Sequence, residues 1–268
     1  MLARDRAIAA LQSETFDVVV IGGGITGAGV ALDAASRGYS VALVEKADYA
    51  SGTSSRSSKL VHGGLRYLQN FDLGLVREAL LERQLMVKLA PHLVKPLQMV
   101  VPAFDGAKPD RLVGIGLNMY DVMSTPALRR RRSARRAAQQ HASRGGRAGV
   151  DNGEVDWSPA RHRVISGEEV VELLPALRQR GPTGGYLFYD CQTDDVRLVL
   201  TVLGEAERFG AICANRLEVT ELVGAHGPDG RLGEESGVRV RDGESGAEFV
   251  VAGANVINAT GVWADRIR

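Results

Sequence analysis

The order of strand, glycine turn, helix and strand near the N-terminus constrains this chain more than any other feature. Residues 16–21 (FDVVVI) are mostly β-branched and apolar, which predicts a strand buried on both faces. Small and aliphatic residues predominate over 26–37 and predict a helix that ends at Gly38. A second apolar strand follows at 40–44. Together these elements predict a right-handed βαβ unit and therefore an α/β fold.

The turn between the first strand and the helix has the spacing of a dinucleotide-binding loop, G-x-G-x-x-G. Gly22 allows a tight turn, Gly24 lets a pyrophosphate approach the backbone, and Gly27 lets the helix pack against the strand. Glu45 lies 23 residues after Gly22, near the spacing of about 20 at which a carboxylate binds ribose hydroxyls. An acid at this position favours FAD or NAD over NADP. The alternative is a glycine turn with a structural role only.

The overall composition is that of a globular protein. Of the 268 residues, 44% are hydrophobic and 24% charged, which is enough for a buried core. Cys191 and Cys213 stand alone and no histidine pair has metal-ligand spacing, so we expect no metal site and a reducing, cytoplasmic compartment. No apolar run reaches the roughly 18 residues of a membrane span, and the N-terminus lacks a signal peptide's apolar stretch. The histidines without a metal-ligand partner are expected to be structural or exposed: His92, His141, His162 and His226.

Basic charge is concentrated in one segment of the chain. There are 33 Lys and Arg against 32 Asp and Glu, but eight arginines and no acid lie between Arg129 and Arg147. Elsewhere acidic residues outnumber basic ones, 32 to 25. A solvated loop over 129–149 is the simplest interpretation, and attraction to an anionic membrane surface is the second. Nucleic-acid binding is disfavoured, because no aromatic residues alternate with the arginines.

The other apolar patterns predict further helices and strands. Asp72 and Asp194 are expected to cap helices, and Ser166 to form a capping box with Glu169. The predicted elements are a helix at 73–89, a strand at 97–101, a helix at 111–123, a strand at 185–189, a helix at 194–209, a strand at 217–223, a hairpin at 238–251 and a strand at 255–258.

Several long segments resemble one flavoprotein family. They are IGGGITGAGVALDAASRG (21–38), EKADYASGTSSRSSKLVHGGLRYL (45–68), VREALLERQLMVKLAPHLVKPL (76–97), YDCQTDDVRL (189–198) and NVINATGVWADRI (255–267). In this order, and over nearly the whole chain, they resemble the FAD-dependent glycerol-3-phosphate dehydrogenase family. The run from Ser51 to Leu68 is the most specific part, since other FAD oxidoreductases share the glycine turn but not SSKLVHGGLRYL.

The resemblance implies an FAD/NAD(P)-binding Rossmann-like fold of the glutathione-reductase type. We therefore predict an FAD-binding domain made of 1–97 and 184–268, with an inserted, incomplete cap or substrate segment at 98–183. The implied reaction oxidises sn-glycerol 3-phosphate to dihydroxyacetone phosphate and passes the electrons to a quinone. Glycerol 3-phosphate and a quinone are thus the expected partners. Peripheral contact with the inner face of the cytoplasmic membrane and a homodimer are further expectations, without nucleic acid.

The resemblance also implies contacts to FAD. The loop after the second strand is expected to reach the FAD phosphates with its hydroxyls and amides, from Ser51, Thr53, Ser54 and Ser55. Val219 matches a backbone contact to adenine, and the turn at Ala259 and Gly261 a second contact to the pyrophosphate or ribityl chain. A flexible loop and an ordinary strand-to-helix turn are the structural alternatives.

The segment HGGLRY at 62–67 is the candidate catalytic segment. Gly63 and Gly64 have no side chains, so their backbone can lie against a flat flavin ring. His62 is a candidate base for the C2 hydroxyl, with a hydrogen-bonded structural role as the alternative. Arg66 offers a planar guanidinium for a phosphate or an alkoxide, and Tyr67 adds a neutral donor.

The resemblance covers the N-terminal half of the family pattern. Family members continue past the turn that corresponds to Gly261, into the rest of the substrate domain and a closing FAD strand with a Gly-Gly-Lys segment. We therefore expect a truncated chain with an incomplete active site. The alternatives are a non-catalytic FAD-binding remnant, and another FAD-dependent oxidoreductase that acts on amino or hydroxy acids.

Overall fold

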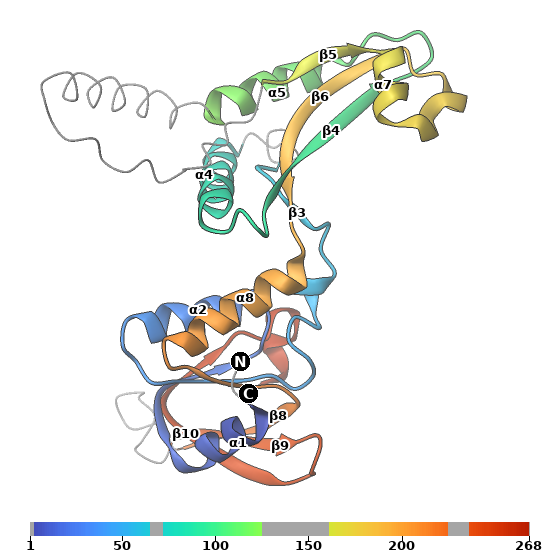
Figure 1. Cartoon of the computed structure of the whole chain (residues 1–268). Coiled ribbons are helices and arrows are strands. Elements are labelled where there is room, and N and C mark those ends of the chain that lie inside the picture. The colour runs from blue at the N-terminus through green and yellow to red at the C-terminus, as the bar shows by residue number, and fades with distance from the viewer. Residues whose placement is uncertain (1–2, 65–71, 125–160, 225–235, 268) are drawn as a thin grey trace, which may run out of the picture. The chain divides into compact units, whose positions relative to one another are not determined.

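The chain forms two compact units (Figure 1). The computed structural model describes residues 3–64, 72–124, 161–224 and 236–267. Unit 1 comprises the chain up to Lys59 and from Asp194 onward, and unit 2 runs from Leu60 to Thr193. These limits differ from the predicted ones, because 97/98 falls within the strand Lys95–Ala103 and 183/184 at the start of the strand Gly184–Gln192, and these two strands pair in one sheet of unit 2. The arginine-rich segment lies outside the described residues.

A six-stranded sheet in the order β7-β2-β1-β10-β9-β8 forms the centre of unit 1. The elements of unit 1 are α1 (Arg4–Ser13), β1 (Thr15–Ile21), α2 (Ile25–Ser36), β2 (Val41–Val44), η1 (Thr53–Ser55), α8 (Asp195–Arg208), β7 (Ile212–Ala214), β8 (Leu217–Val223), β9 (Gly237–Asp242), β10 (Glu248–Asn258) and η3 (Gly261–Arg266). Strand β1 pairs in parallel with β2 and β10, and β2 pairs in parallel with β7. The predicted βαβ order and the α/β class are confirmed.

Helices pack on both faces of this sheet. On one face, α2 and α8 pack together and against β1 and β2 through small and aliphatic side chains such as Ala31 and Leu203. On the other face, Ala7 and Leu11 of α1 belong to one core cluster with residues of β1, β2 and β9. The sequence patterns did not predict α1. Because residues 18–21 of β1 are buried on both faces, this strand lies at the centre of the unit, as predicted.

Strand β10 is longer than the sequence indicated and has two partners. Its first half, 248–252, pairs antiparallel with β9, which confirms the predicted hairpin. The strand then continues to Asn258 and pairs in parallel with β1. The predicted separate strand at 255–258 is therefore the second half of one eleven-residue strand. Its end carries residues 259–261 to the same edge of the sheet as the glycine turn.

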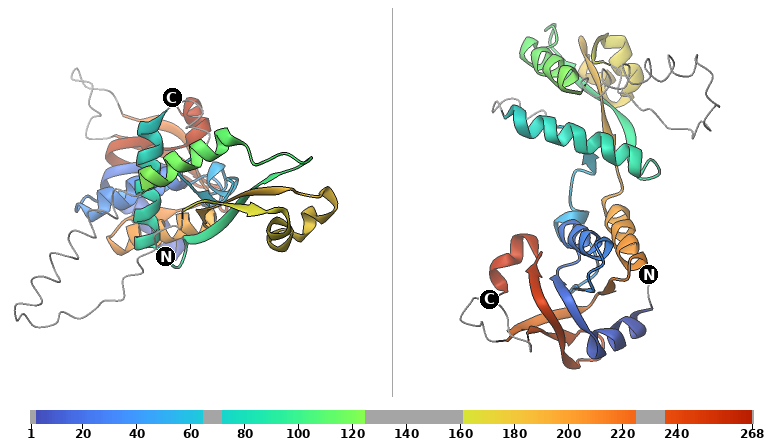
Figure 2. Two further views of the ribbon diagram at one scale, coloured as in Figure 1. Left: turned by 90° about the horizontal axis from the view of Figure 1, so that it is seen from above. Right: turned by 90° about the vertical axis from the view of Figure 1, so that its left-hand side faces the viewer.

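Unit 2 contains a four-stranded sheet in which β6 is the common partner. Its elements are β3 (Leu60–Val61), α4 (Leu73–Leu89), β4 (Lys95–Ala103), α5 (Arg111–Ser124), β5 (Arg163–Ser166), α7 (Gly167–Leu173), η2 (Pro175–Arg180) and β6 (Gly184–Gln192). Strand β4 pairs with the whole of β6 on one edge, whereas β3 and β5 share the other edge. Helices α4 and α5 pack against each other beside this sheet (Figure 2).

Side chains of β6 alternate between two packed faces. Tyr186 and Phe188 pack with Leu117 of α5, and Leu187 packs with Val170 of α7 on the opposite face. Asp190 is in phase with Tyr186 and Phe188, so it faces α4 and α5. A carboxylate is thereby carried into an otherwise apolar face of the sheet.

Helix caps follow the local sequence signals. Asp72, Ser166 and Asp194 each accept a hydrogen bond from the backbone N–H three residues later, at 3.0–3.2 Å. The predicted capping box is only half formed, because the Glu169 carboxylate accepts from the Arg163 guanidinium. Local sequence therefore predicts where these helices begin, and Arg163 of the preceding strand β5 decides what Glu169 binds.

Candidate cofactor site

A cavity of about 590 Å³ lies in unit 1, where β1, β2 and β10 end. The glycine turn, the first turn of α2, the loop after β2, strand β8 and η3 contribute to its walls. Parallel strands end at a common edge, and this edge is where α/β proteins bind nucleotides. The predicted cofactor residues that line the cavity are Gly22, Gly24, Glu45, Ser51, Thr53, Ser54, Val219, Ala259 and Gly261.

The three glycines of the turn differ in what surrounds them. Gly22 has φ +112°, and a Cβ there would lie 2.7 Å from the Ala259 carbonyl oxygen. A Cβ on Gly27 would lie 1.9 Å from the Gly22 carbonyl oxygen, so only glycine lets α2 pack this close to the turn. A Cβ on Gly24 would lie in the cavity wall, 3.2 Å from Ser54 Oγ. The surroundings of Gly22 and Gly27 agree with the turn and packing functions predicted from the motif, and the ligand-approach function of Gly24 stays a prediction.

Glu45 connects the end of β2 to the glycine turn. Its Oε2 accepts a hydrogen bond from the Gly23 amide and its Oε1 accepts from the Ala47 amide, both at 2.8 Å. A carboxylate oxygen has a second lone pair, so each oxygen still has acceptor capacity toward the cavity. The side chain therefore has a structural function in addition to the predicted contact with ribose.

The serine-rich loop is tied to the start of α2. Ser54 Oγ accepts a hydrogen bond from the Ile25 amide at 3.0 Å. Thr53 and Ser51 line the cavity beside it. Ser55 does not line the cavity, because its hydroxyl donates to the Gly52 carbonyl oxygen at 3.3 Å. Three of the four predicted residues of this loop thus line the cavity.

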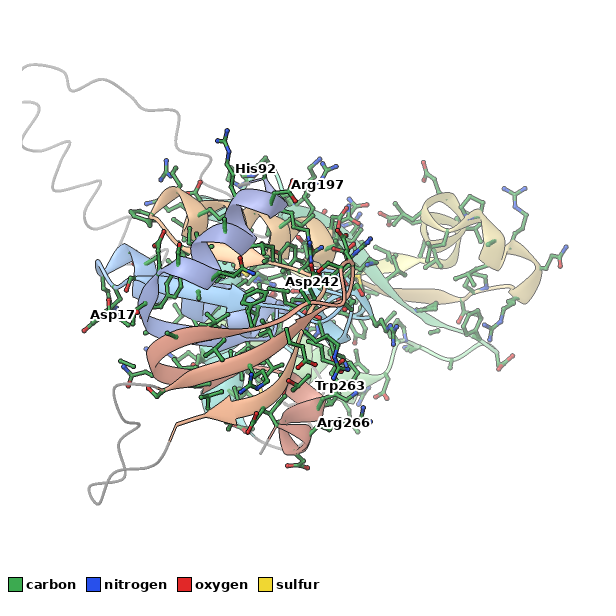
Figure 3. The ribbon with its side chains drawn as sticks, turned by 90° about the horizontal axis from the view of Figure 1, so that it is seen from below. Asp17, His92, Arg197, Asp242, Trp263 and Arg266 are labelled. Carbon is green, nitrogen blue, oxygen red and sulfur yellow. The ribbon has the colours of Figure 1, made fainter. Side chains whose placement is uncertain are left out.

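Sequence analysis missed several residues of the cavity wall, among them Lys46, Trp263 and Arg266. Trp263 and Arg266 both belong to η3 (Figure 3). The Lys46 ammonium lies 6.0 Å from the centre of the Trp263 ring, and a Cβ on Gly52 would come within 2.8 Å of that ring. The loop after β2 and the chain after β10 therefore meet at Trp263. A tryptophan close behind the Asn-Ala-Thr-Gly turn was the signal that could have indicated this contact.

The candidate catalytic segment belongs to unit 2. His62 is exposed, whereas Gly63 and Gly64 are buried. The Gly63 amide donates to the Tyr120 hydroxyl at 2.7 Å, and a Cβ on Gly63 would lie 2.5 Å from Leu80 Cδ2. Packing against α4 and α5 is therefore sufficient reason for glycine at this position. Arg66 and Tyr67 lie outside the described residues.

A buried polar cluster holds the Tyr120 hydroxyl. Tyr120 donates to Asp190 Oδ1 at 2.7 Å, and Arg83 Nη1 donates to the same oxygen at 2.5 Å. Arg83 is fully buried and Asp190 is 4% exposed. Burial raises the pKa of the Tyr120 phenol, so its proton stays in place to donate to Asp190. No spacing in the sequence connects these residues, which come from α4, α5 and β6.

His162, which was expected to be structural or exposed, contacts a carboxylate. His162 Nδ1 lies 2.7 Å from Asp121 Oδ2, and the His162 amide donates to the same carboxylate at 3.1 Å.

Within the described part of the chain, no group of three or more His, Cys, Asp or Glu could hold a metal ion. The helices described here are all too short or too polar to cross a membrane.

The cavity fits the nucleotide part of FAD. The first N–H groups of a helix have no intrahelical partner and favour a phosphate, and the 12-residue α2 begins at the cavity. A glycine surface beside it allows close approach of a pyrophosphate. Glu45 and Lys46 place a carboxylate and a cation in the cavity wall, groups whose chemistry suits a ribose and a phosphate.

Known proteins similar to this chain include glycerol-3-phosphate dehydrogenases and an alpha-glycerophosphate oxidase. The glycerol-3-phosphate dehydrogenase of Mycobacterium leprae is 43% identical over 262 residues, which is 96% of this chain. An alpha-glycerophosphate oxidase of Streptococcus pyogenes is 36% identical over 99% of the chain. The structure of the glycerol-3-phosphate dehydrogenase from Bacillus halodurans complexed with FAD is 28% identical, with a TM-score of 0.63 over 98% of the chain.

The similarity concerns one part of longer proteins. The chain spans 38% of the length of each of these three. A family described as FAD dependent oxidoreductase matches residues 17–268, a range that includes every residue of the cavity wall. The chain belongs to the FAD dependent oxidoreductase family.

Proposed function

We propose that this chain is the FAD-binding part of an enzyme that oxidises sn-glycerol 3-phosphate to dihydroxyacetone phosphate. Similarity to glycerol-3-phosphate dehydrogenases over 96% of the chain carries the proposal. The cavity of unit 1 supports it, because its glycines, hydroxyls, carboxylate and lysine suit a dinucleotide. In this proposal, Ser51, Thr53 and Ser54 contact the FAD phosphates and Glu45 binds the adenosine ribose.

The proposed chemistry requires a base and an anion site in unit 2. FAD, when bound, accepts the hydride that leaves C2 of glycerol 3-phosphate. His62 takes the proton of the C2 hydroxyl, Arg66 binds the phosphate, and Tyr67 donates a hydrogen bond to the substrate. The oxidised product is the ketone dihydroxyacetone phosphate.

The test is anaerobic reduction of the bound flavin. Protein purified with FAD is yellow, and addition of glycerol 3-phosphate is expected to bleach its visible absorbance. Glycine, proline and lactate serve as controls for an oxidoreductase that acts on amino or hydroxy acids. Flavin that binds but is bleached by none of them would support the non-catalytic alternative, and bleaching by a control alone would assign a different substrate class.

Arg66→Ala separates substrate binding from cofactor binding. Loss of the guanidinium is expected to raise the KM for glycerol 3-phosphate by about a hundredfold, as for loss of a charge-assisted contact. The Kd for FAD is expected to stay unchanged. A variant that loses flavin and keeps its substrate affinity contradicts the assignment.

For the electron acceptor we propose a quinone. The relatives include an alpha-glycerophosphate oxidase, which favours oxygen as a second candidate. Reoxidation of the reduced flavin by a soluble quinone without hydrogen peroxide supports the first, and stoichiometric peroxide supports the second.

The arginine-rich segment would bring the protein to an anionic membrane, which vesicle co-sedimentation measures. The homodimer stays a prediction, which sedimentation velocity tests.

A further inference from the structure

The loop from Ser51 to Lys59 is held in unit 1 at both ends. Near its start, the hydroxyl of Ser54 accepts from the first amide of α2. Near its end, Ser57 and Lys59 both contact Asp195, the first residue of α8. The first tie lies within η1, and residues 51–54 line the cavity. Two helix N-termini therefore determine where this loop lies.

Asp195 is the centre of the second tie. Its Oδ2 accepts a hydrogen bond from the Ser57 hydroxyl at 2.8 Å, and its Oδ1 accepts from the Lys59 ammonium and from the Val196 amide. The Lys59 amide donates to Ser57 Oγ at 3.0 Å, which closes the arrangement. Asp195 is 7% exposed, and no FAD contact was assigned to it from sequence.

Helix α8, which carries Asp195, is packed into the core of unit 1. Helix α8 packs on α2 through Val199, Leu203 and Ala206, which join Ala28 and Ala31 in one core cluster. Because α2 starts at the glycine turn, the two ties refer to one packed helix pair. Hydrogen bonds from Lys59 and Ser57 lower the pKa of the Asp195 carboxyl to about 2. The carboxylate is therefore charged at neutral pH.

We propose that Asp195 is a positioning residue for FAD: it holds the loop 51–59 so that the hydroxyls of Ser51, Thr53 and Ser54 face the phosphates. This inference rests on the proposed binding of FAD in the cavity. Asp195 itself does not line the cavity and acts through Ser57 and Lys59.

The first experiment compares Asp195→Asn with Asp194→Asn in the full chain. Asp194 also caps α8 but is exposed and bonds only to its own helix in the described structure, through the Arg197 amide. Titration of the apoprotein with FAD gives Kd from flavin fluorescence. Asp195→Asn is expected to raise Kd about tenfold, the factor for loss of one charge-assisted hydrogen bond. Asp194→Asn is expected to leave Kd unchanged.

A second measurement separates loop position from general stability. Arg56 is exposed within the tied loop, so trypsin cleavage after Arg56 reports release of the loop. This cleavage is expected to accelerate in Asp195→Asn while cleavage elsewhere does not. Lys59→Met removes the same ion pair from the loop side, and its effect on Kd is expected to be non-additive with that of Asp195→Asn.

The outcomes distinguish this inference from the proposed function. Wild-type Kd and wild-type cleavage in Asp195→Asn overturn the positioning role while FAD binding stands. Absence of FAD binding by the wild-type chain overturns the proposed function and this inference with it. Equal weakening by Asp195→Asn and Asp194→Asn assigns the effect to the start of α8 and also overturns the inference.

Discussion

Arg83 and Asp190 place opposite charges inside unit 2, in contact with Tyr120. Moving two charges out of water is costly, and the cost is recovered only when geometry and hydrogen bonds are good. The Tyr120 hydroxyl and the Tyr189 carbonyl oxygen add acceptors for Arg83 Nη1. The Tyr120 hydroxyl of this cluster also accepts a hydrogen bond from the Gly63 amide, and this bond holds the backbone beside His62.

Removal of the Asp190 charge is therefore expected to be strongly destabilising. Asp190→Ala leaves Arg83 buried without its carboxylate, which lowers the free energy of unfolding by about 3 kcal/mol or more. Urea denaturation measures this change. Glu221→Gln is the matched control, because it breaks an ion pair with Arg239 that is exposed, and a loss below about 1 kcal/mol is expected there. Equal effects of the two substitutions would contradict the role of burial.

The carboxylates of Asp195 and Asp242 make stability depend on acid pH. Lys59 lowers the pKa of Asp195 to about 2, and the Arg4 guanidinium lowers that of Asp242. Both folded-state pKa values lie below the unfolded value of about 4, so their contribution is complete above pH 4 and is lost as pH falls toward 2. Tm is expected to fall steeply below pH 4, with a shallower fall in Asp195→Asn. An identical pH profile for both proteins contradicts this assignment.

Among the elements, helix α2 can pack against the glycine turn only because residue 27 has no side chain. Gly27 and Gly29 belong to the same helix, but a Cβ on Gly29 has no neighbour within 4 Å. The Cβ of Gly27 would overlap the turn that forms the cavity floor. The same substitution at these two positions therefore tests close packing against helix propensity.

Gly27→Ala is expected to lower the free energy of unfolding by about 3 kcal/mol, because α2 must move away from the turn. FAD affinity is expected to fall with it, since the helix N-terminus moves from the cavity. Gly29→Ala is expected to stabilise the protein by about 0.5 to 1 kcal/mol. Denaturation curves and FAD titrations of both variants test the pair, and a stable, FAD-binding Gly27→Ala protein would falsify the packing argument.

For the molecule as a whole, FAD binding and the stability of unit 1 are linked. The cavity wall consists entirely of residues from unit 1, although they come from both ends of the chain. A ligand that binds only the folded state at a hundred times its Kd stabilises that state by about 2.7 kcal/mol. Saturating FAD is therefore expected to raise the free energy of unfolding of unit 1, which the N-terminal and C-terminal segments build together.

Calorimetry with and without FAD measures this linkage. FAD is expected to raise Tm by about 5 to 10 °C. NADP is the matched control ligand: the Glu45 carboxylate repels its 2′-phosphate, so a smaller shift is expected. Equal shifts with both ligands would contradict a role for Glu45 in choosing the nucleotide.

Local patterns in the sequence determined the first βαβ unit, the glycine turn, the helix starts at Asp72, Ser166 and Asp194, and the family resemblance. The turn and the helix starts depend on residues a few positions apart, because caps, turns and hydrophobic periodicity are set by neighbouring residues in the sequence. Only the tertiary structure decided that β10 continues beyond its hairpin to pair with β1, that Asp195 holds the loop before Leu60, and that Arg83 meets Asp190. These contacts join residues far apart in the chain, and the packing of complete elements brings them together.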